Sequence, residues 1–254
     1  LPQAIRDGIT SFKIYMTYDA LKVSDEQILD ILLLASEQGA LVMIHAENHD
    51  MIRWLTRKLI ANGHTSPKFH GVAHDPLAES EATHRAIALA RLIDVPILIV
   101  HVAGKEALQV IHSAQTLGAN ILAESCPQYL FLTETDLDRT GLEGAKYCCS
   151  PPPRDPASQQ AVWQSMLDGT VQIYSSDHAP YRFDQTGKLP KGDQTRFDEL
   201  ANGLPGLELR MPLLFSEGVL TGRMSIERFV ALTATNHAQT YGLYPRKGTI
   251  AVGS

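Results

Sequence analysis

Four short apolar segments of this sequence end in a residue that can bind a metal ion. The segments read ITSFK, ALVMIH, VPILIVH and TVQIYSSD, and they end at Lys13, His45, His101 and Asp177. Each has the length and the β-branched content of a strand, and a helical pattern follows three of the four directly. This alternation predicts a (β/α) barrel of the TIM type, in which catalytic groups lie at the carboxyl ends of the strands. Metal-binding side chains at four strand ends favour a metal-dependent hydrolase over a binding scaffold.

The composition excludes several other classes of protein. With 254 residues the chain is long enough for one barrel-sized domain. Its formal net charge of −6 gives no support for binding nucleic acid or an anionic membrane, and no apolar stretch is long enough to span a membrane. The opening LPQAIRDGIT lacks the basic start and apolar core of a signal peptide. Three cysteines with no Cys-x-x-Cys pair suit a reducing compartment, so we expect a cytoplasmic protein.

Hydrophobic periodicity predicts about six strands, with helices between most of them. The strands are expected near residues 9–15, 41–46, 96–102, 120–125, 147–150 and 171–177. The helices are expected at about 24–39, 48–62, 77–93, 104–117, 156–168, 206–219, 225–234 and 235–242. Two segments are expected to be loops: 63–76, with three histidines on the surface, and 181–204, a long loop at the active site.

A closed barrel of this type has eight strands, so we expect two strands to lie upstream of residue 1. The ending KGTIAVGS has the pattern of a strand that stops short. Residues 1–245 are therefore expected to form a partial barrel domain. Residues 246–254 are expected to begin a C-terminal segment that is cut short.

The four strand-end residues suit a divalent metal in different ways. His45 and His101 offer imidazole, a common zinc ligand, and Asp177 offers a hard oxygen ligand that can also act as a general base. A protonated Lys13 would repel a dication, but a neutral, buried lysine can react with carbon dioxide to form an anionic carbamate that bridges two metals. The alternatives are a lysine that extends to solvent at the barrel mouth and histidines that are simply hydrogen-bonded in the core.

Seven segments, in the same order along the chain, resemble the dihydropyrimidinase and D-hydantoinase family of cyclic amidohydrolases, within the amidohydrolase superfamily. They are GITSFKIYMTY, VMIHAEN, IVHVAG, ESCPQYL, CSPPPR, SSDHAP and NGLPGLELRMPLLFSEGV. The resemblance covers essentially the whole chain, and the ordered set is more specific than any single motif. It implies hydrolysis of the cyclic amide bond of dihydropyrimidines or 5-substituted hydantoins to N-carbamoyl amino acids.

The resemblance also implies a metal site with two divalent ions, expected to be zinc, bridged by Lys13 after its carbamylation by carbon dioxide. His45 and His101 would bind one metal. Asp177 would bind the other, and would pass a proton from the attacking hydroxide to the leaving nitrogen. The family's His-x-His pair has no counterpart among the ten histidines here. We therefore expect the chain to be the central and C-terminal part of a longer enzyme, and to be inactive by itself.

Three further residues are implied to hold the substrate, a small cyclic amide or imide. Tyr18 would donate its hydroxyl to the developing oxyanion, and backbone groups of Ser150 and Asn202 would hold the ring amide. Without the resemblance, Tyr18 could equally be an aromatic residue packed at the barrel rim. Ser150 and the Asn202-Gly203 dipeptide would then be ordinary turn residues.

Two related activities and one non-catalytic role stay open as alternatives. Allantoinase and dihydroorotase belong to the same class, and the latter needs a cation for the substrate carboxylate, for which Arg154 and Arg182 are loop candidates. A non-catalytic relative would keep the barrel as an assembly scaffold, although such relatives lose metal-binding residues. The resemblance further implies a homo-oligomer, either a tetramer or a dimer. Among the remaining candidates, Cys126 is expected to be buried as a small hydrophobic residue, and His178 to point away from the site.

Overall fold

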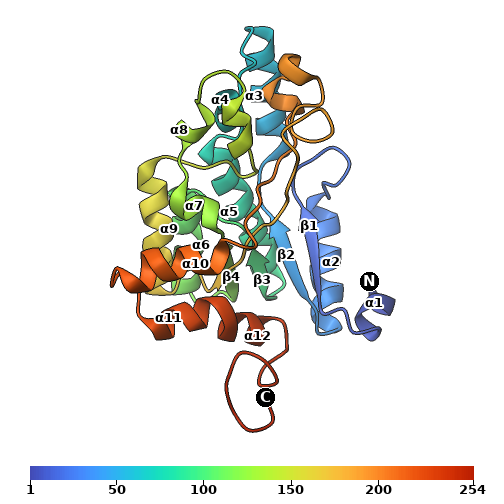
Figure 1. The fold of residues 1–254 in the computed structure, drawn as a ribbon. Coiled ribbons are helices and arrows are strands. Elements are labelled where there is room, and N and C mark those ends of the chain that lie inside the picture. The colour runs from blue at the N-terminus through green and yellow to red at the C-terminus, as the bar shows by residue number, and fades with distance from the viewer.

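The computed structural model describes all 254 residues and contains one parallel sheet of five strands in the order β1-β2-β3-β4-β5. The strands are β1 Ser11–Tyr15, β2 Leu41–His45, β3 Ile97–Ile99, β4 Ile121–Ser125 and β5 Ile173–Tyr174. Each strand pairs with the next one along the chain, as successive strands of a (β/α) barrel do (Figure 1). The predicted partial barrel architecture is therefore confirmed.

Twelve α-helices surround the sheet and extend beyond its ends (Figure 1). They are α1 Pro2–Arg6, α2 Asp25–Glu37, α3 His49–Ala61, α4 Lys68–Ala73, α5 Pro76–Leu92, α6 Lys105–Thr116, α7 Pro127–Phe131, α8 Glu134–Leu137, α9 Pro156–Asp168, α10 Arg210–Leu214, α11 Ile226–Val230 and α12 Asn236–Thr240. Three short 3₁₀ helices lie at Glu143–Tyr147, Gly192–Gln194 and Phe197–Glu199, and π-helical turns continue α10 and α11 at Phe215–Leu220 and Ala231–Thr235. None of the helices combines the length and apolar character needed to cross a bilayer.

Both faces of the sheet are buried, which explains why its strands read as nearly continuous apolar runs. Alternate residues such as Ile97 and Ile99 join the main core, to which α2, α5, α6 and α9 contribute their apolar stripes. Leu98 faces the other way, into a smaller cluster with Leu41 and Val100. This second face is the interior of the barrel.

The parallel register decides which polar side chains share that interior face. Lys13 lies opposite Met43, which packs against the interior cluster, and Tyr15 lies opposite His45. Because side chains alternate along a strand, Lys13, Met43 and His45 all point to the interior. The register of two neighbouring strands therefore brings Lys13 and His45 to one side of the sheet.

Helix α2 begins where the sequence predicts, because Ser24 and Gln27 cap its first turn with two reciprocal hydrogen bonds. The Gln27 amide donates to Ser24 Oγ at 3.2 Å, and the Ser24 amide donates to Gln27 Oε1 at 2.8 Å. This capping box satisfies two backbone donors that a helix start leaves free.

The strand predicted at residues 147–150 is absent. The Cys148 carbonyl accepts hydrogen bonds from the Gly203 amide and the Lys188 ammonium group instead of from a neighbouring strand. The prolines at 151–153 have no N–H to donate, so a ladder cannot continue there. The ending at residues 247–254 also forms no strand, and Ile250 is fully exposed there.

The loop predicted at residues 63–76 contains helix α4 and is less exposed than expected. His70 and His74 lie one helical turn apart and are both buried, at 3% and 7% exposure. Only His64 is exposed, as expected. The segment was mistaken for a loop because a helix of six residues is too short to show periodicity.

Candidate active site

A cavity of about 390 Å³ at the carboxyl end of the sheet brings together all seven residues that the sequence singled out. Its lining contains Lys13, Tyr18, His45, His101, Ser150, Asp177 and Asn202, together with Tyr15, Leu21, Ala179, Tyr181 and Gly203. These residues come from six separate parts of the chain, which only the packing of the sheet and its loops brings together.

Three of the four metal-binding candidates lie where a strand ends. His45 is the last residue of β2, His101 follows β3 by two residues, and Asp177 follows β5 by three. Lys13 differs, because it is the third of five residues in β1 and its side chain is exposed rather than buried. The reason is its place on an edge strand, since β1 pairs only with β2.

The two histidines of the cavity lie edge to face, with ring centroids 4.5 Å apart. His45 Nε2 lies 2.7 Å from Glu47 Oε2, and Glu47 is fully buried. Burial would raise the pKa of Glu47, but His74 and His45 together lower it well below its usual value. An ionised carboxylate can only accept, so His45 Nε2 must donate, and Nδ1 is the ring nitrogen left free for a ligand.

His101 is buried at 2% exposure, and its Nδ1 has no hydrogen-bond partner. Burial, followed by the charges of His45 and Lys13, lowers its pKa well below the usual value, which keeps the ring neutral and able to bind a cation. Two neutral imidazoles and a carboxylate are donors that a divalent metal accepts. No group of three or more His, Cys, Asp or Glu side chains is close enough together to hold a metal as they stand.

Three residues of the cavity have left-handed backbone conformations, which side chains other than glycine rarely adopt. The φ angles are 70° at Tyr18, 41° at His101 and 44° at Asp177. Only one other non-glycine residue in the chain, Asp94, has a positive φ. Backbone strain of this kind concentrates at functional sites, where it aims a side chain that a relaxed loop would not.

The Tyr18 hydroxyl lies beside the side chains of Ser150 and Asn202. Burial, with the negative charge of Glu47, raises the pKa of Tyr18, while these two polar neighbours partly oppose the rise. A phenol with a raised pKa stays protonated and can donate a hydrogen bond. The ring also packs against His45, with centroids 5.2 Å apart.

The Asp177 carboxyl is partly buried, and Asp177 follows β5, the edge strand opposite β1, which carries Lys13. Burial raises its pKa above the usual value, although Lys13 and His45 act in the other direction. Gln128 Nε2 donates to Asp177 Oδ2 at 3.4 Å. A carboxyl group with a raised pKa is better suited to exchange protons near neutral pH.

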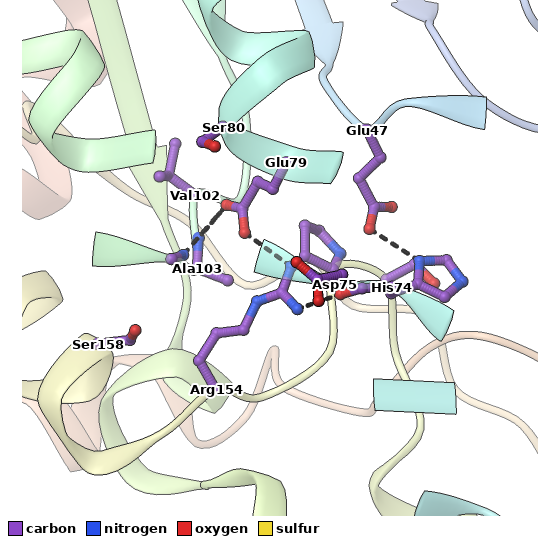
Figure 2. Close-up of polar contacts among 12 residues, drawn as sticks. Glu47, His74, Asp75, Glu79, Ser80, Val102, Ala103, Arg154 and Ser158 are labelled. Carbon is purple, nitrogen blue, oxygen red and sulfur yellow. Dashed lines mark hydrogen bonds and ion pairs between the residues drawn. The ribbon is translucent and has the colours of Figure 1, made fainter. Parts of the chain in front are cut away.

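A network of buried polar residues around Glu47 and Glu79 was not predicted (Figure 2). Glu47 Oε1 accepts from His74 Nδ1 at 2.8 Å, and Glu79 Oε2 accepts from Arg154 at 2.9 Å. The only sequence signal for Glu47 is its place two residues after His45, which keeps it on the same side of the chain. Nothing local in the sequence marks the distant partners.

Arg154 and Arg182 do not line the cavity, so neither can serve as the cation that binds a substrate carboxylate there. Arg154 is buried and paired with Glu79, and Arg182 is exposed in the loop at 181–204. The expectations for two other residues are confirmed. Cys126 is fully buried, and His178 is exposed, with Nδ1 accepting from the amides of Gly206 and Leu207.

Comparison with known proteins gives a consistent result. A family model described as "Amidohydrolase family" matches residues 2–254. The D-hydantoinase of Geobacillus stearothermophilus is 42% identical over 256 aligned residues, covering 100% of this chain and 54% of the relative. The chain thus spans about half the length of the curated relatives it matches.

Solved structures agree in fold. A dihydropyrimidinase from Brevibacillus agri superimposes with a TM-score of 0.93 at 44% identity, covering 98% of this chain and 53% of the other. A D-hydantoinase from a Bacillus species gives a TM-score of 0.95 at 42% identity, with 100% and 55% covered. A dihydroorotase from Campylobacter jejuni gives 0.67 at 17% identity, a likeness of fold alone.

Proposed function

This chain belongs to the amidohydrolase family, and from that membership we propose that its site serves the hydrolysis of a cyclic amide. The substrates are dihydropyrimidines or 5-substituted hydantoins, and the products are N-carbamoyl amino acids. The observation that carries the proposal is one cavity that gathers the candidate metal ligands with the candidate substrate-binding residues. These are Lys13, His45, His101 and Asp177, and Tyr18, Ser150 and Asn202.

The family implies the use of divalent metal ions, and we assign two zinc ions to this cavity. His45 and His101 would hold one ion, Asp177 the other, and carbamylated Lys13 both. Carbamylation would join the deprotonated form of the Lys13 amine to the carbon of carbon dioxide and release one proton, which leaves an anionic oxygen ligand; the exposure of Lys13 leaves the amine accessible to carbon dioxide. When bound, the ions would lower the pKa of the attacking water and polarise the ring carbonyl. The free Nδ1 of His101 supports this assignment.

Side chains and backbone groups of this chain supply the oxyanion, proton-transfer and substrate-binding roles. Tyr18, which its raised pKa keeps protonated, donates a hydrogen bond to the oxygen on which negative charge develops. Asp177 takes a proton from the attacking water and gives it to the leaving ring nitrogen. Backbone groups at Ser150 and Asn202 would hold the ring amide, and Tyr15 and Leu21, which also line the cavity, would contact the exocyclic group.

A dihydroorotase activity has less support than a hydantoinase or dihydropyrimidinase activity. It needs a cation beside the substrate carboxylate, and Lys13, already assigned to the metals, is the only lysine or arginine in the cavity lining. We further propose a homo-oligomeric protein, a dimer or tetramer, that acts in the cytoplasm. The three cysteines are all free thiols, which suits a reducing compartment.

The decisive experiment compares metal retention by the whole enzyme, of which we propose this chain to be a part, and by its Lys13→Ala variant. Each protein is loaded with Zn²⁺ and passed through gel filtration, and its metal content is measured by elemental analysis, alongside ring opening of hydantoin and dihydrouracil. In the whole enzyme, which we propose also supplies the His-x-His pair that this chain lacks, the native protein should hold close to two metals and Lys13→Ala far fewer, with partial restoration by short carboxylic acids. Lys22→Ala, which removes a half-exposed lysine outside the cavity lining, is the matched control. Full metal content and normal turnover in Lys13→Ala would refute the carbamate assignment.

A further inference from the structure

Lys188 is a buried lysine in the loop at 181–204 that the proposed reaction does not use. Its exposure is 3%, and no carboxylate lies within ion-pair distance of its ammonium group. Nζ donates instead to two backbone carbonyls, that of Cys148 at 2.6 Å and that of Ala201 at 2.9 Å. The ring of Tyr181 lies 5.8 Å from the same nitrogen.

The two carbonyls belong to the two segments that border the proposed substrate-binding groups. Cys148 precedes Ser150 by two residues, and Ala201 precedes Asn202 directly. The segments also touch each other, since the Gly203 amide donates to the Cys148 carbonyl at 3.0 Å and Cys148 Sγ donates to Asn202 Oδ1 at 3.3 Å. Lys188 thus joins the segments at the point where they meet.

Burial of an ammonium group is costly unless hydrogen bonds replace its water. Burial lowers the pKa of Lys188, the direction expected when hydrogen bonds replace only part of its hydration. The interactions that oppose this cost are directed donations from a charged group, which are roughly twice as strong as neutral ones. They form only when the Cys148 and Ala201 carbonyls are held a fixed distance apart, so they favour one relative position of the two segments.

We propose that Lys188 is a positioning residue. It fixes the Asn202 segment against the Ser150 segment, and thereby fixes the relative position of the backbone groups that bind the substrate ring. The effect on substrate binding rests on the proposed function, whereas the fixed position of the two segments does not. Lys188 acts through the two backbone segments and is not itself in the cavity lining.

The first test measures the opening of the two segments by the reactivity of the Cys148 thiol, without metal or substrate. Cys148 is fully buried, and burial raises its pKa to about 12, so labelling by N-ethylmaleimide requires local opening. Lys188→Met should speed Cys148 labelling roughly tenfold or more, because the lost donations hold the segments closed. Removing the positive charge by itself would act the other way, since Lys188 lowers the pKa of this thiol.

Two controls separate local opening from general unfolding. Lys191→Met removes an exposed lysine of the same loop, paired with Glu199 at the surface, and should leave the labelling rate unchanged. Cys126, fully buried at the end of β4, should stay unlabelled in every variant when peptides are resolved by mass spectrometry. Lys188→Gln, whose amide can still donate, should label Cys148 at an intermediate rate. Equal Cys148 rates in all variants, or equal acceleration at Cys126, would overturn the positioning role.

The second test addresses substrate binding by steady-state hydrolysis of hydantoin in the whole enzyme. Lys188→Met should raise KM roughly tenfold with much less change in kcat, since the ring amide is held alike in the ground state and the transition state. Absence of turnover in the whole native enzyme would contradict the proposed function and leave the labelling comparison decisive for Lys188. Faster Cys148 labelling with an unchanged KM would show that the segments are fixed by Lys188 but do not grip the substrate, which overturns that part of the proposal.

Discussion

The buried ion pair between Glu79 and Arg154 allows a quantitative prediction about stability. Both side chains are nearly inaccessible, at 3% and 4% exposure, and Arg154 lies 2.9 Å from Glu79 Oε2. Glu79 Oε1 also accepts from the amides of Ala103 and Gly104, in the turn that follows His101 (Figure 2). Glu79→Gln preserves the size of the side chain but leaves the guanidinium group of Arg154 buried without a counter-charge.

Loss of one partner from a buried pair typically destabilises a protein by about 3–5 kcal/mol, because the remaining charge stays desolvated. For a chain of this length, that corresponds to a fall in Tm of roughly 6–20 °C. Urea titration followed by circular dichroism gives the free energy of unfolding for each variant. Glu81→Gln is the matched control, since Glu81 lies on the same helix but is 42% exposed in its pair with Arg85. It should cost no more than about 1 kcal/mol.

The combined variant Glu79→Gln with Arg154→Met makes the test stricter. Methionine removes the unpaired cation, so the double variant should lose less stability than the sum of the two single losses. A loss of under about 1 kcal/mol in Glu79→Gln, indistinguishable from Glu81→Gln, would refute the argument that the charge of Glu79 is needed to bury Arg154.

Two further predictions concern pH dependence and backbone geometry. Burial lowers the pKa of His70 to about 3, so between that pH and about 6.5 the unfolded chain binds a proton that the folded chain excludes, and stability falls as the pH falls. His70→Gln should flatten the slope of unfolding free energy against pH by up to about 1.4 kcal/mol per unit, and an unchanged slope in urea titrations would contradict this. Gly203 has φ 156°, and a Cβ there would come within 2.5 Å of Ala179 Cβ, so Gly203→Ala should cost at least about 2 kcal/mol in thermal unfolding. Gly222→Ala, where a Cβ meets nothing within 4 Å, should cost about 1 kcal/mol, and equal losses would argue against the clash.

The sequence was most informative where function depends on the ends of strands. The positions of His45, His101 and Asp177 follow from the rule that parallel strands present their carboxyl ends at one edge, and the cavity confirms that these residues lie together. Lys13 ends an apolar run, but the strand expected near residues 9–15 does continue to Tyr15, so Lys13 lies inside β1 rather than at its end.

Contacts between distant residues could not be predicted in the same way. Glu79 and Arg154 are 75 residues apart, and Lys188 reaches a carbonyl 40 residues away. Neither pairing leaves a local pattern, because each is selected by packing among loops rather than by the period of a helix or strand. The same reasoning explains why a strand was wrongly predicted at 147–150. The carbonyl of Cys148 there accepts hydrogen bonds from distant loop residues, which no local pattern in the sequence reveals.

The left-handed backbone at Tyr18, His101 and Asp177 has a practical consequence for engineering. Each such conformation costs on the order of 1–3 kcal/mol, and the net stability of a whole domain is only about 5–15 kcal/mol. Laboratory evolution under heat alone would therefore reward glycine or asparagine at these three positions, and the first thermostable variants would be the first to lose the site. Selection for heat resistance should consequently be coupled to a screen for catalysis from its first round.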